Sequence, residues 1–100
     1  MKEHIFKKYL ENILNHLDII QDEFFEESKK REVVMPRQML YYLCREKANM
    51  QFTEIKSYLS KQGFEVSLDT IIYGSNSFGE LLKEDKDYQY IVEKLQDIEL

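Results

Sequence analysis

Hydrophobic side chains in the first quarter of the chain recur at alternating spacings of four and three residues. They are Phe6, Leu10, Ile13, Leu17, Ile20 and Phe24. This spacing places them on one face of an α-helix and leaves the other faces polar. We therefore expect either one long helix over residues 2–27 or two helices with a break near Asp18 to Asp22. Because fewer than three heptads follow the pattern, a face packed into the core is favoured over a coiled-coil seam.

A second hydrophobic stretch begins after a short basic connector, Ser28-Lys29-Lys30-Arg31. Pro36 suits the first turn of a new helix, where its missing N–H leaves no hydrogen bond unmade. The apolar residues that follow are Met39, Leu40, Leu43 and Cys44, with Tyr42 beside them. They predict an amphipathic helix that ends near Ala48-Asn49.

Three shorter amphipathic segments make up the second half of the chain. The first covers residues 52–59 and closes at Gly63, because glycine best accepts the left-handed backbone that ends many helices. Ser67 is placed to cap the next helix. The buried face of that helix is expected to consist of Leu68, Ile71 and Ile72. The last helix is expected to begin near Asp87.

The sequence predicts an all-α fold, a small bundle of five to six helices. Three glycines and one proline in 100 residues leave few places for turns, which favours helices over a sheet. Gly74 and Gly79 each lower helix propensity by up to about 1 kcal/mol relative to alanine, so their helix is expected to fray or bend there. A short helix, a glycine-containing turn and a capped second helix are also the parts of a helix-turn-helix motif.

Composition and charge narrow the class of protein. A chain of 12.1 kDa with 43% hydrophobic residues can form one domain with its own core, which we expect to span residues 1–100. A single cysteine, Cys44, cannot form an intramolecular disulfide, which indicates a reducing, cytoplasmic location. The longest apolar run, residues 39–44, is too short to cross a membrane.

The net charge of −5 is unevenly distributed and does not exclude nucleic acid as a partner. Residues 1–50 carry nine basic and nine acidic side chains, whereas residues 51–100 carry five basic and ten acidic ones. The acidity therefore lies in the second half of the chain. The half that contains the basic connector is neutral overall.

Residues 28–46 read Ser-Lys-Lys-Arg-Glu-Val-Val-Met-Pro-Arg-Gln-Met-Leu-Tyr-Tyr-Leu-Cys-Arg-Glu. This stretch resembles the start of the C-terminal DNA-binding domain of the bacterial replication initiator DnaA. That family has a basic cluster, then Arg-Gln before a helix that contains Tyr-Leu and Arg-Glu. Phe52-Thr53-Glu54-Ile55 is similar to the family's Ser-Leu-x-Glu-Ile, and Thr70-Ile71-Ile72-Tyr73-Gly74 to its Thr-Val-Ile-His-Ala.

The resemblance covers about Asp18 to Glu99. It implies an all-α domain with an embedded helix-turn-helix that binds double-stranded DNA in DNA replication. On this basis we divide the chain into an N-terminal amphipathic helical segment, residues 1–27, and a helix-turn-helix region, residues 28–99.

The resemblance also implies which cations would contact DNA. In the family, the arginine that matches Arg37 enters the minor groove, where narrow A·T-rich DNA concentrates negative potential. Lys29, Lys30 and Arg31 match the basic cluster and would contact the DNA backbone. The alternative for these side chains is a solvated charge run between helices, balanced by neighbouring glutamates.

The helix expected to read bases departs from the family pattern. The family's Arg-Asp-His-Thr-Thr-Val corresponds to residues 66–71, where only the second Thr is retained, and residues 66–82 contain no Lys or Arg. The side chains that remain for base edges are Ser67, Asp69, Thr70 and Tyr73. Ser67 and Asp69 equally suit helix capping. We therefore expect a site preference different from the DnaA box.

We find no signature of an enzyme, a cofactor, a metal site, a membrane partner or a small-molecule substrate. His4 and His16 lie twelve residues apart, and no glycine-rich phosphate loop is present. Two hypotheses remain. The chain is either a DNA-binding helix-turn-helix module, or a protein-interaction or homodimerisation module that kept the scaffold and lost DNA readout.

Overall fold

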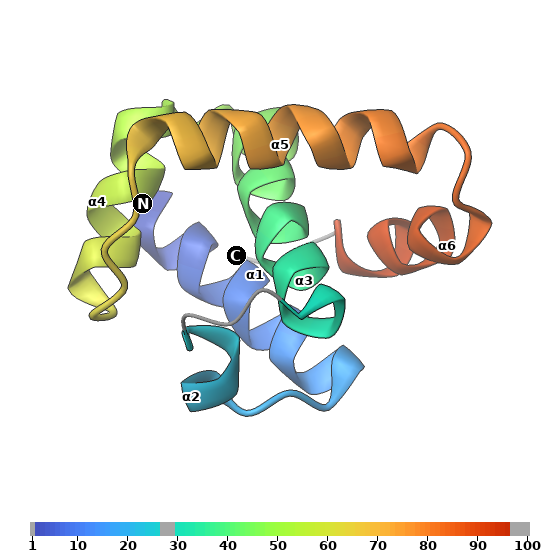
Figure 1. Ribbon diagram of the computed structural model, residues 1–100, viewed down its shortest axis with the longest axis horizontal. Coiled ribbons are helices and arrows are strands. Elements are labelled where there is room, and N and C mark those ends of the chain that lie inside the picture. Colours follow the sequence, from blue (N-terminus) through green and yellow to red (C-terminus); the bar gives the residue numbers. More distant parts are fainter. Residues whose placement is uncertain (1, 27–29, 97–100) are drawn as a thin grey trace.

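A computed structural model of the chain describes residues 2–26 and 30–96, and every regular element within them is a helix (Figure 1). In chain order these elements are α1 (Lys2–Leu17), α2 (Gln21–Phe24), α3 (Arg31–Tyr42), the π-helical turn η1 (Leu43–Lys47), α4 (Phe52–Lys61), α5 (Leu68–Leu82) and α6 (Lys86–Leu95). The prediction of a small all-α bundle is confirmed. None of the described helices has both the length and the apolar composition that crossing a membrane requires.

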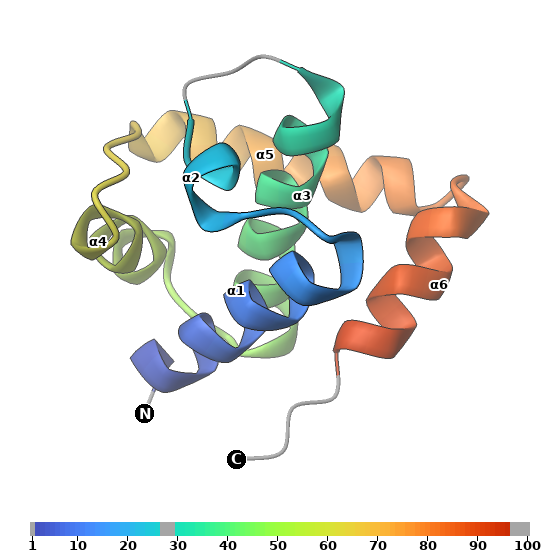
Figure 2. The ribbon, with the colours of Figure 1, turned by 90° about the horizontal axis from the view of Figure 1, so that it is seen from below.

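Helix α3 lies at the centre of the bundle. In Figure 1, α5 lies across α3, and α1 and α2 pack beneath; Figure 2 shows α1 nearer the viewer, with α5 behind α3. The sequence explains this position, because α3 carries apolar side chains on most of its faces and η1 adds two more such side chains. Their buried residues are Met35, Pro36, Arg37, Met39, Leu40, Tyr41, Leu43 and Cys44. The core therefore surrounds α3, and α1 adds its own apolar stripe.

The first stretch of the chain forms two helices, as one of the two alternatives predicted. Asp18 adopts a left-handed backbone with φ of 55°, and the N–H of Ile19 donates to the carbonyl of Leu14 at 3.0 Å. The hydrophobic stripe continues across this break, since Phe24 in α2 is fully buried. Ile20, at the break itself, is 63% exposed. A turn has thus moved one member of the stripe into solvent.

Helix α3 begins at Arg31, earlier than Pro36 suggested. The proline therefore lies inside the helix, where it leaves the carbonyl of Glu32 without its usual N–H donor. In the first turn of α3, the N–H groups of Val33 and Val34 both donate to the carbonyl of Lys30. The C-terminal end agrees with the prediction, since η1 ends at Lys47 and Asn49 has a φ of 55°.

Helix α5 is continuous across both of its glycines. Gly74 is buried where α5 packs on α3, and a Cβ at this position would lie 3.0 Å from Cδ2 of Tyr41 and 3.1 Å from Cγ of Gln38. A Cβ at Gly79 would be 3.4 Å from the ring of Tyr42, which is an ordinary contact. Gly74 therefore permits the close approach of α5 to α3, whereas Gly79 lowers helix propensity without a comparable packing role.

The two glycines should respond oppositely to alanine. Gly79→Ala is expected to raise the free energy of unfolding by about 0.5–1 kcal/mol through helix propensity. Gly74→Ala is expected to lower it by about 1 kcal/mol, because overpacking against the buried ring of Tyr41 outweighs the same gain. Urea denaturation followed by circular dichroism measures both. Equal stabilisation by the two variants would contradict the packing role of Gly74.

Candidate nucleic-acid interface

Helices α4 and α5 and the turn between them form the expected helix-turn-helix. Gly63 has a φ of 84° and the N–H of Phe64 donates to the carbonyl of Leu59 at 3.0 Å, so the predicted helix end is confirmed. Ser67 caps α5, since its hydroxyl oxygen accepts from the N–H of Thr70 at 3.2 Å. Local hydrogen bonds thus define both ends of the turn.

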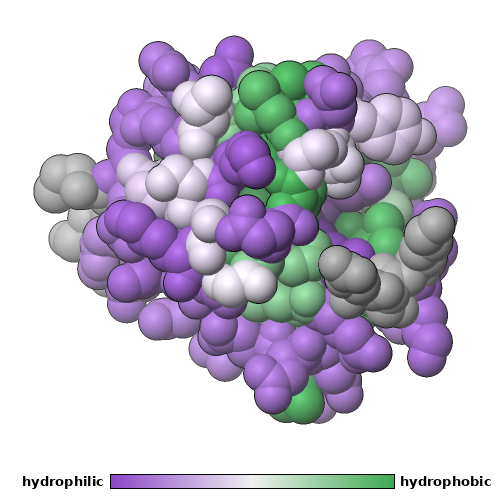
Figure 3. Space-filling model, turned by 60° about the vertical axis from the view of Figure 1, so that its left-hand side comes forward, coloured by the Kyte–Doolittle hydropathy of each residue, from purple (hydrophilic) through white to green (hydrophobic). Residues whose placement is uncertain are grey.

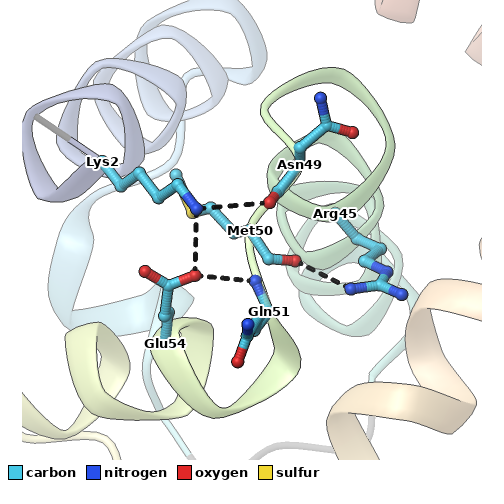
Figure 4. A network of polar contacts seen from close by, with 6 residues as sticks. All are labelled: Lys2, Arg45, Asn49, Met50, Gln51 and Glu54. Atoms are coloured by element: carbon cyan, nitrogen blue, oxygen red, sulfur yellow. Dashed lines mark hydrogen bonds and ion pairs between the residues drawn. The ribbon is translucent and has the colours of Figure 1, made fainter.

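A polar network holds the start of α4 against α1 and η1 (Figure 4). Its residues are Lys2, Arg45, Asn49, Met50, Gln51 and Glu54. The carboxylate of Glu54 accepts from the N–H of Gln51 at 2.9 Å and pairs with the ammonium of Lys2 at 3.3 Å. The hydrogen bond from the backbone N–H of Gln51 is the largest cause that lowers the pKa of Glu54, and the contact with Lys2 also lowers it. The guanidinium of Arg45 donates to the carbonyl of Met50 at 3.1 Å. The first helix of the motif is therefore fixed at its N-terminus by two neighbouring elements.

One face of α5 is buried on the bundle and the other is exposed. The buried residues are Ile71, Gly74, Ser75 and Phe78. The exposed residues are Asp69, Thr70, Tyr73, Asn76 and Glu80. Tyr73 is 69% exposed, and neither Tyr73 nor Asn76 makes a hydrogen bond with another described residue. The predicted candidates on this helix therefore share one accessible face with Asn76.

The surface around the motif is mostly hydrophilic. Figure 3 shows the molecule from the side of α4 and the start of α5, where polar residues surround a narrow hydrophobic band. The exposed positions of α4 include Thr53, Ser57 and Ser60, which carry hydroxyl groups. Hydrogen bonding, rather than extended apolar contact, is the interaction that this face offers.

An exposed arginine lies on each side of α5. Arg45, whose guanidinium lies 4.6 Å from the ring centroid of Phe52, lines a depression of about 580 Å³ together with Asn76. Arg31 lines a second depression, of about 500 Å³, together with Ser77. The ring of Phe52 orients Arg45 while its remaining N–H donors stay accessible. Arg45 was not among the candidates from sequence, although its place at the end of a helix leading into the motif was a usable signal.

Glu80, the acidic residue in the C-terminal half of the exposed face, is paired. Its carboxylate lies 2.6 Å from the ammonium of Lys83, and this pair raises the pKa of Lys83. The exposed face of α5 therefore carries less unpaired negative charge than its sequence suggests. Asp69 remains as the carboxylate at the N-terminal end.

Arg37 is held inside the domain. Its side chain is buried, with 9% of the residue exposed, and Nη1 donates to the carbonyls of Phe24 at 2.8 Å and Glu26 at 3.0 Å. The guanidinium also lies 5.3 Å from the ring centroid of Phe64. Burial lowers the pKa of Arg37, with Tyr41 acting in the opposite sense. One side chain thus joins the end of α2, helix α3 and the turn of the motif.

The remaining predicted cations precede this arginine in the chain by six to eight residues. Lys30 and Arg31 are exposed at the start of α3. Lys29 lies outside the described residues. The contact of Arg37 with a minor groove stays a prediction, and the geometry here engages Arg37 with backbone carbonyls. Sequence reasoning missed this internal role because both carbonyls belong to an earlier segment.

The other titratable candidates are not brought together. His4 and His16 are both exposed, and residues 2–26 and 30–96 contain no group of three or more His, Cys, Asp or Glu that could hold a metal ion. Cys44 is fully buried, and burial raises the pKa of its thiol. The thiol therefore acts as a small hydrophobic group.

Removing the donors of Arg37 should destabilise the fold. Arg37→Met keeps a long apolar stem but leaves two carbonyls unpaired, so the free energy of unfolding is expected to fall by about 1–3 kcal/mol. Arg31→Met, at an exposed position, is the matched control and should stay within about 0.5 kcal/mol of the wild type. Urea denaturation gives both values. Equal effects at the two positions would show that the internal bonds of Arg37 contribute nothing.

Burial of Tyr41 should make stability fall at alkaline pH. Tyr41 is 2% exposed, and burial raises its pKa to about 12 despite the nearby charge of Arg37. Since tyrosine in the unfolded chain ionises near pH 10, the unfolded state alone loses this proton between about pH 10 and 12. Tyr41→Phe should reduce the fall in the free energy of unfolding over that pH range by about 2 kcal/mol. Urea denaturation at a series of pH values measures it, and Tyr90→Phe, at an exposed ring, is expected to follow the wild type.

Comparison with known proteins agrees with this architecture. The family described as "Bacterial dnaA protein helix-turn-helix" matches residues 7–71, from α1 to the first turns of α5. The chromosomal replication initiator protein DnaA of Lachnoclostridium phytofermentans is 23% identical over 86 residues, which cover 86% of this chain and 18% of that protein. The chain therefore spans less than a fifth of that relative's length. No solved structure gives a significant match. With a family match over more than half of its residues, the chain belongs to the bacterial DnaA helix-turn-helix family.

Proposed function

We propose that the chain is a non-enzymatic module that binds double-stranded DNA with α5 in the major groove. The observation that supports this most is the division of α5 into two faces. The face with Ile71 and Phe78 packs on the bundle, whereas Thr70, Tyr73 and Asn76 are exposed and carry hydrogen-bonding groups. A helix held in this way can enter a groove without disturbing the core.

The exposed face would read bases by hydrogen bonds from uncharged groups and one carboxylate. Asn76 suits the paired donor and acceptor of adenine, and Asp69 can accept from the amino group of cytosine. The methyl group of Thr70 suits the methyl group of thymine. The DnaA-box preference is not expected, because Val66, Ser67 and Leu68 stand where the family has Arg-Asp-His.

Cations beside α5, rather than on it, would hold the DNA backbone. Arg31 and Arg45 are exposed on its two sides, and Lys30 directly precedes Arg31. Lys29, which matches the family's basic cluster, would add to this group. The free N–H groups in the first turn of α5 add a weaker site for phosphate. With so few cations, affinity should be modest and should fall with salt.

The name of the matching relative supports a setting in DNA replication for this binding. The matching protein of L. phytofermentans is named a chromosomal replication initiator. Because this chain corresponds to a small part of that protein, the proposal extends only to DNA binding by this domain. The activities of the rest of the relative are not carried over.

One observation favours a second candidate function. Residues 66–82 contain no Lys or Arg, and Tyr73 is 69% exposed on a helix with two carboxylates. Such a surface also suits a protein partner or a second copy of the chain. On this hypothesis the scaffold is retained and DNA readout is lost.

Fluorescence anisotropy with a random-sequence duplex at low and moderate salt tests the DNA proposal. Binding is expected at low salt, and log Kd should rise linearly with log salt concentration. Arg45→Gln should weaken binding and lower the slope by about one, because one phosphate contact is lost. Lys94→Gln makes the same charge change on α6 and should leave the slope unchanged.

The two candidate functions give different outcomes. Flat titrations at low salt would overturn the DNA proposal, and sedimentation would then test the second candidate through a mass near twice 12.1 kDa. If Arg45→Gln and Lys94→Gln changed the slope of log Kd against log salt concentration equally, the DNA would not be bound by the face around α5 in particular. A duplex carrying a DnaA box should bind no more tightly than the random duplex.

A further inference from the structure

A groove lies on the side of the bundle opposite the exposed face of α5. It has a volume of about 410 Å³ and runs between the turn after α1, the start of α3 and α6. In Figure 2 the turn after α1 faces the viewer, α6 lies to the right, and α5 is behind. Leu17, Ile19, Val33 and Tyr88 contribute half-buried apolar surface to the groove. These side chains provide an apolar floor that no other described element covers.

The rim of this groove is acidic. Asp18, Glu23 and Glu32 line it and are exposed, and an adjoining hollow of about 280 Å³ adds Glu26 and Lys30. The four carboxylates form no ion pair with another described residue. The groove therefore combines apolar surface with an excess of negative charge.

We propose that this groove binds a short peptide segment of a protein partner, in which lysine or arginine residues flank an aliphatic side chain. The floor suits the aliphatic side chain, because its burial removes apolar surface from water. The carboxylates suit the flanking cations and disfavour acidic competitors. The groove holds only about 410 Å³, so a short segment fits it better than the broad surface of a folded domain.

Neighbouring features support this choice of occupant. Ile20, the next residue on the same turn, is 63% exposed and extends the apolar surface. A second copy of this chain fits less well, because each copy has a net charge of −5. Nucleic acid is disfavoured by the same carboxylates. The groove faces away from the exposed face of α5, and Lys30, which lines the adjoining hollow, is the residue that it shares with the proposed DNA-backbone contacts.

Nuclear magnetic resonance with three synthetic peptides tests the proposal. The probes are a short Lys/Leu peptide, a Lys/Ser peptide of equal charge and a Glu/Leu peptide. The Lys/Leu peptide is expected to shift the amide resonances of residues 17–23 and 32–35. The other two probes should bind much more weakly, since each lacks one of the two complementary features.

Matched variants then separate the groove from general attraction to an acidic protein. Glu32→Gln should weaken Lys/Leu binding by roughly two- to fivefold, the effect of one partly exposed ion pair. Glu93→Gln removes the same charge from the exposed side of α6 and should leave binding unchanged. Val33→Thr keeps the shape of the floor but adds a hydroxyl group, and it should also weaken binding.

Four results would overturn the proposal. They are shifts centred outside residues 17–36, equal effects of Glu32→Gln and Glu93→Gln, binding of the Lys/Ser peptide as tight as that of the Lys/Leu peptide, and concentration-dependent shifts in these residues without any peptide. The last result would assign the groove to a second copy of the chain. Circular dichroism of each variant confirms that a loss of binding does not reflect unfolding.

Discussion

The close approach of α5 to α3 at Gly74 is the contact on which the rest of the structure depends. Helix α3 is buried on nearly every side, so each outer helix is positioned by the face of α3 that it covers. Because a Cβ at position 74 would lie 3.0 Å from Tyr41 and 3.1 Å from Gln38, glycine there lets α5 approach α3 this closely without a shift of either side chain. The same contact directs the polar face of α5 outward. Packing in the core thus decides which side chains the motif presents.

The distribution of charge gives the two sides of the bundle different chemistry. Beside α5 the two exposed arginines line depressions that also contain the paired Glu80, whereas the carboxylates that border the groove near α6 form no ion pair with another described residue. A domain with a net charge of −5 can therefore still present a local surface that tolerates phosphate. Net charge alone describes neither side correctly.

Much of the fold was predictable from local patterns, and much of the candidate interface was not. Apolar spacing, the turn at Gly63 and the cap at Ser67 depend on neighbouring residues, which the sequence displays directly. The start of α3 predicted from Pro36 was wrong, because the preference of proline for a first turn was overridden by packing around this central helix. The position of Arg37 could not be predicted, since its partners come from the end of α2 and from the turn of the motif. Contacts between distant segments leave no periodic signal.

The hydrogen bonds of Arg37 bear on the conformational entropy of binding. They attach the backbone of Phe24 and Glu26 to α3, whose first residue is Arg31. Exposed side chains on a backbone that is already fixed, such as Arg31, have fewer conformations to lose when they meet a ligand. If the domain binds DNA as proposed, Arg37 would strengthen that binding without touching a phosphate. Its contribution would be a smaller entropic cost for the exposed cations at the start of α3.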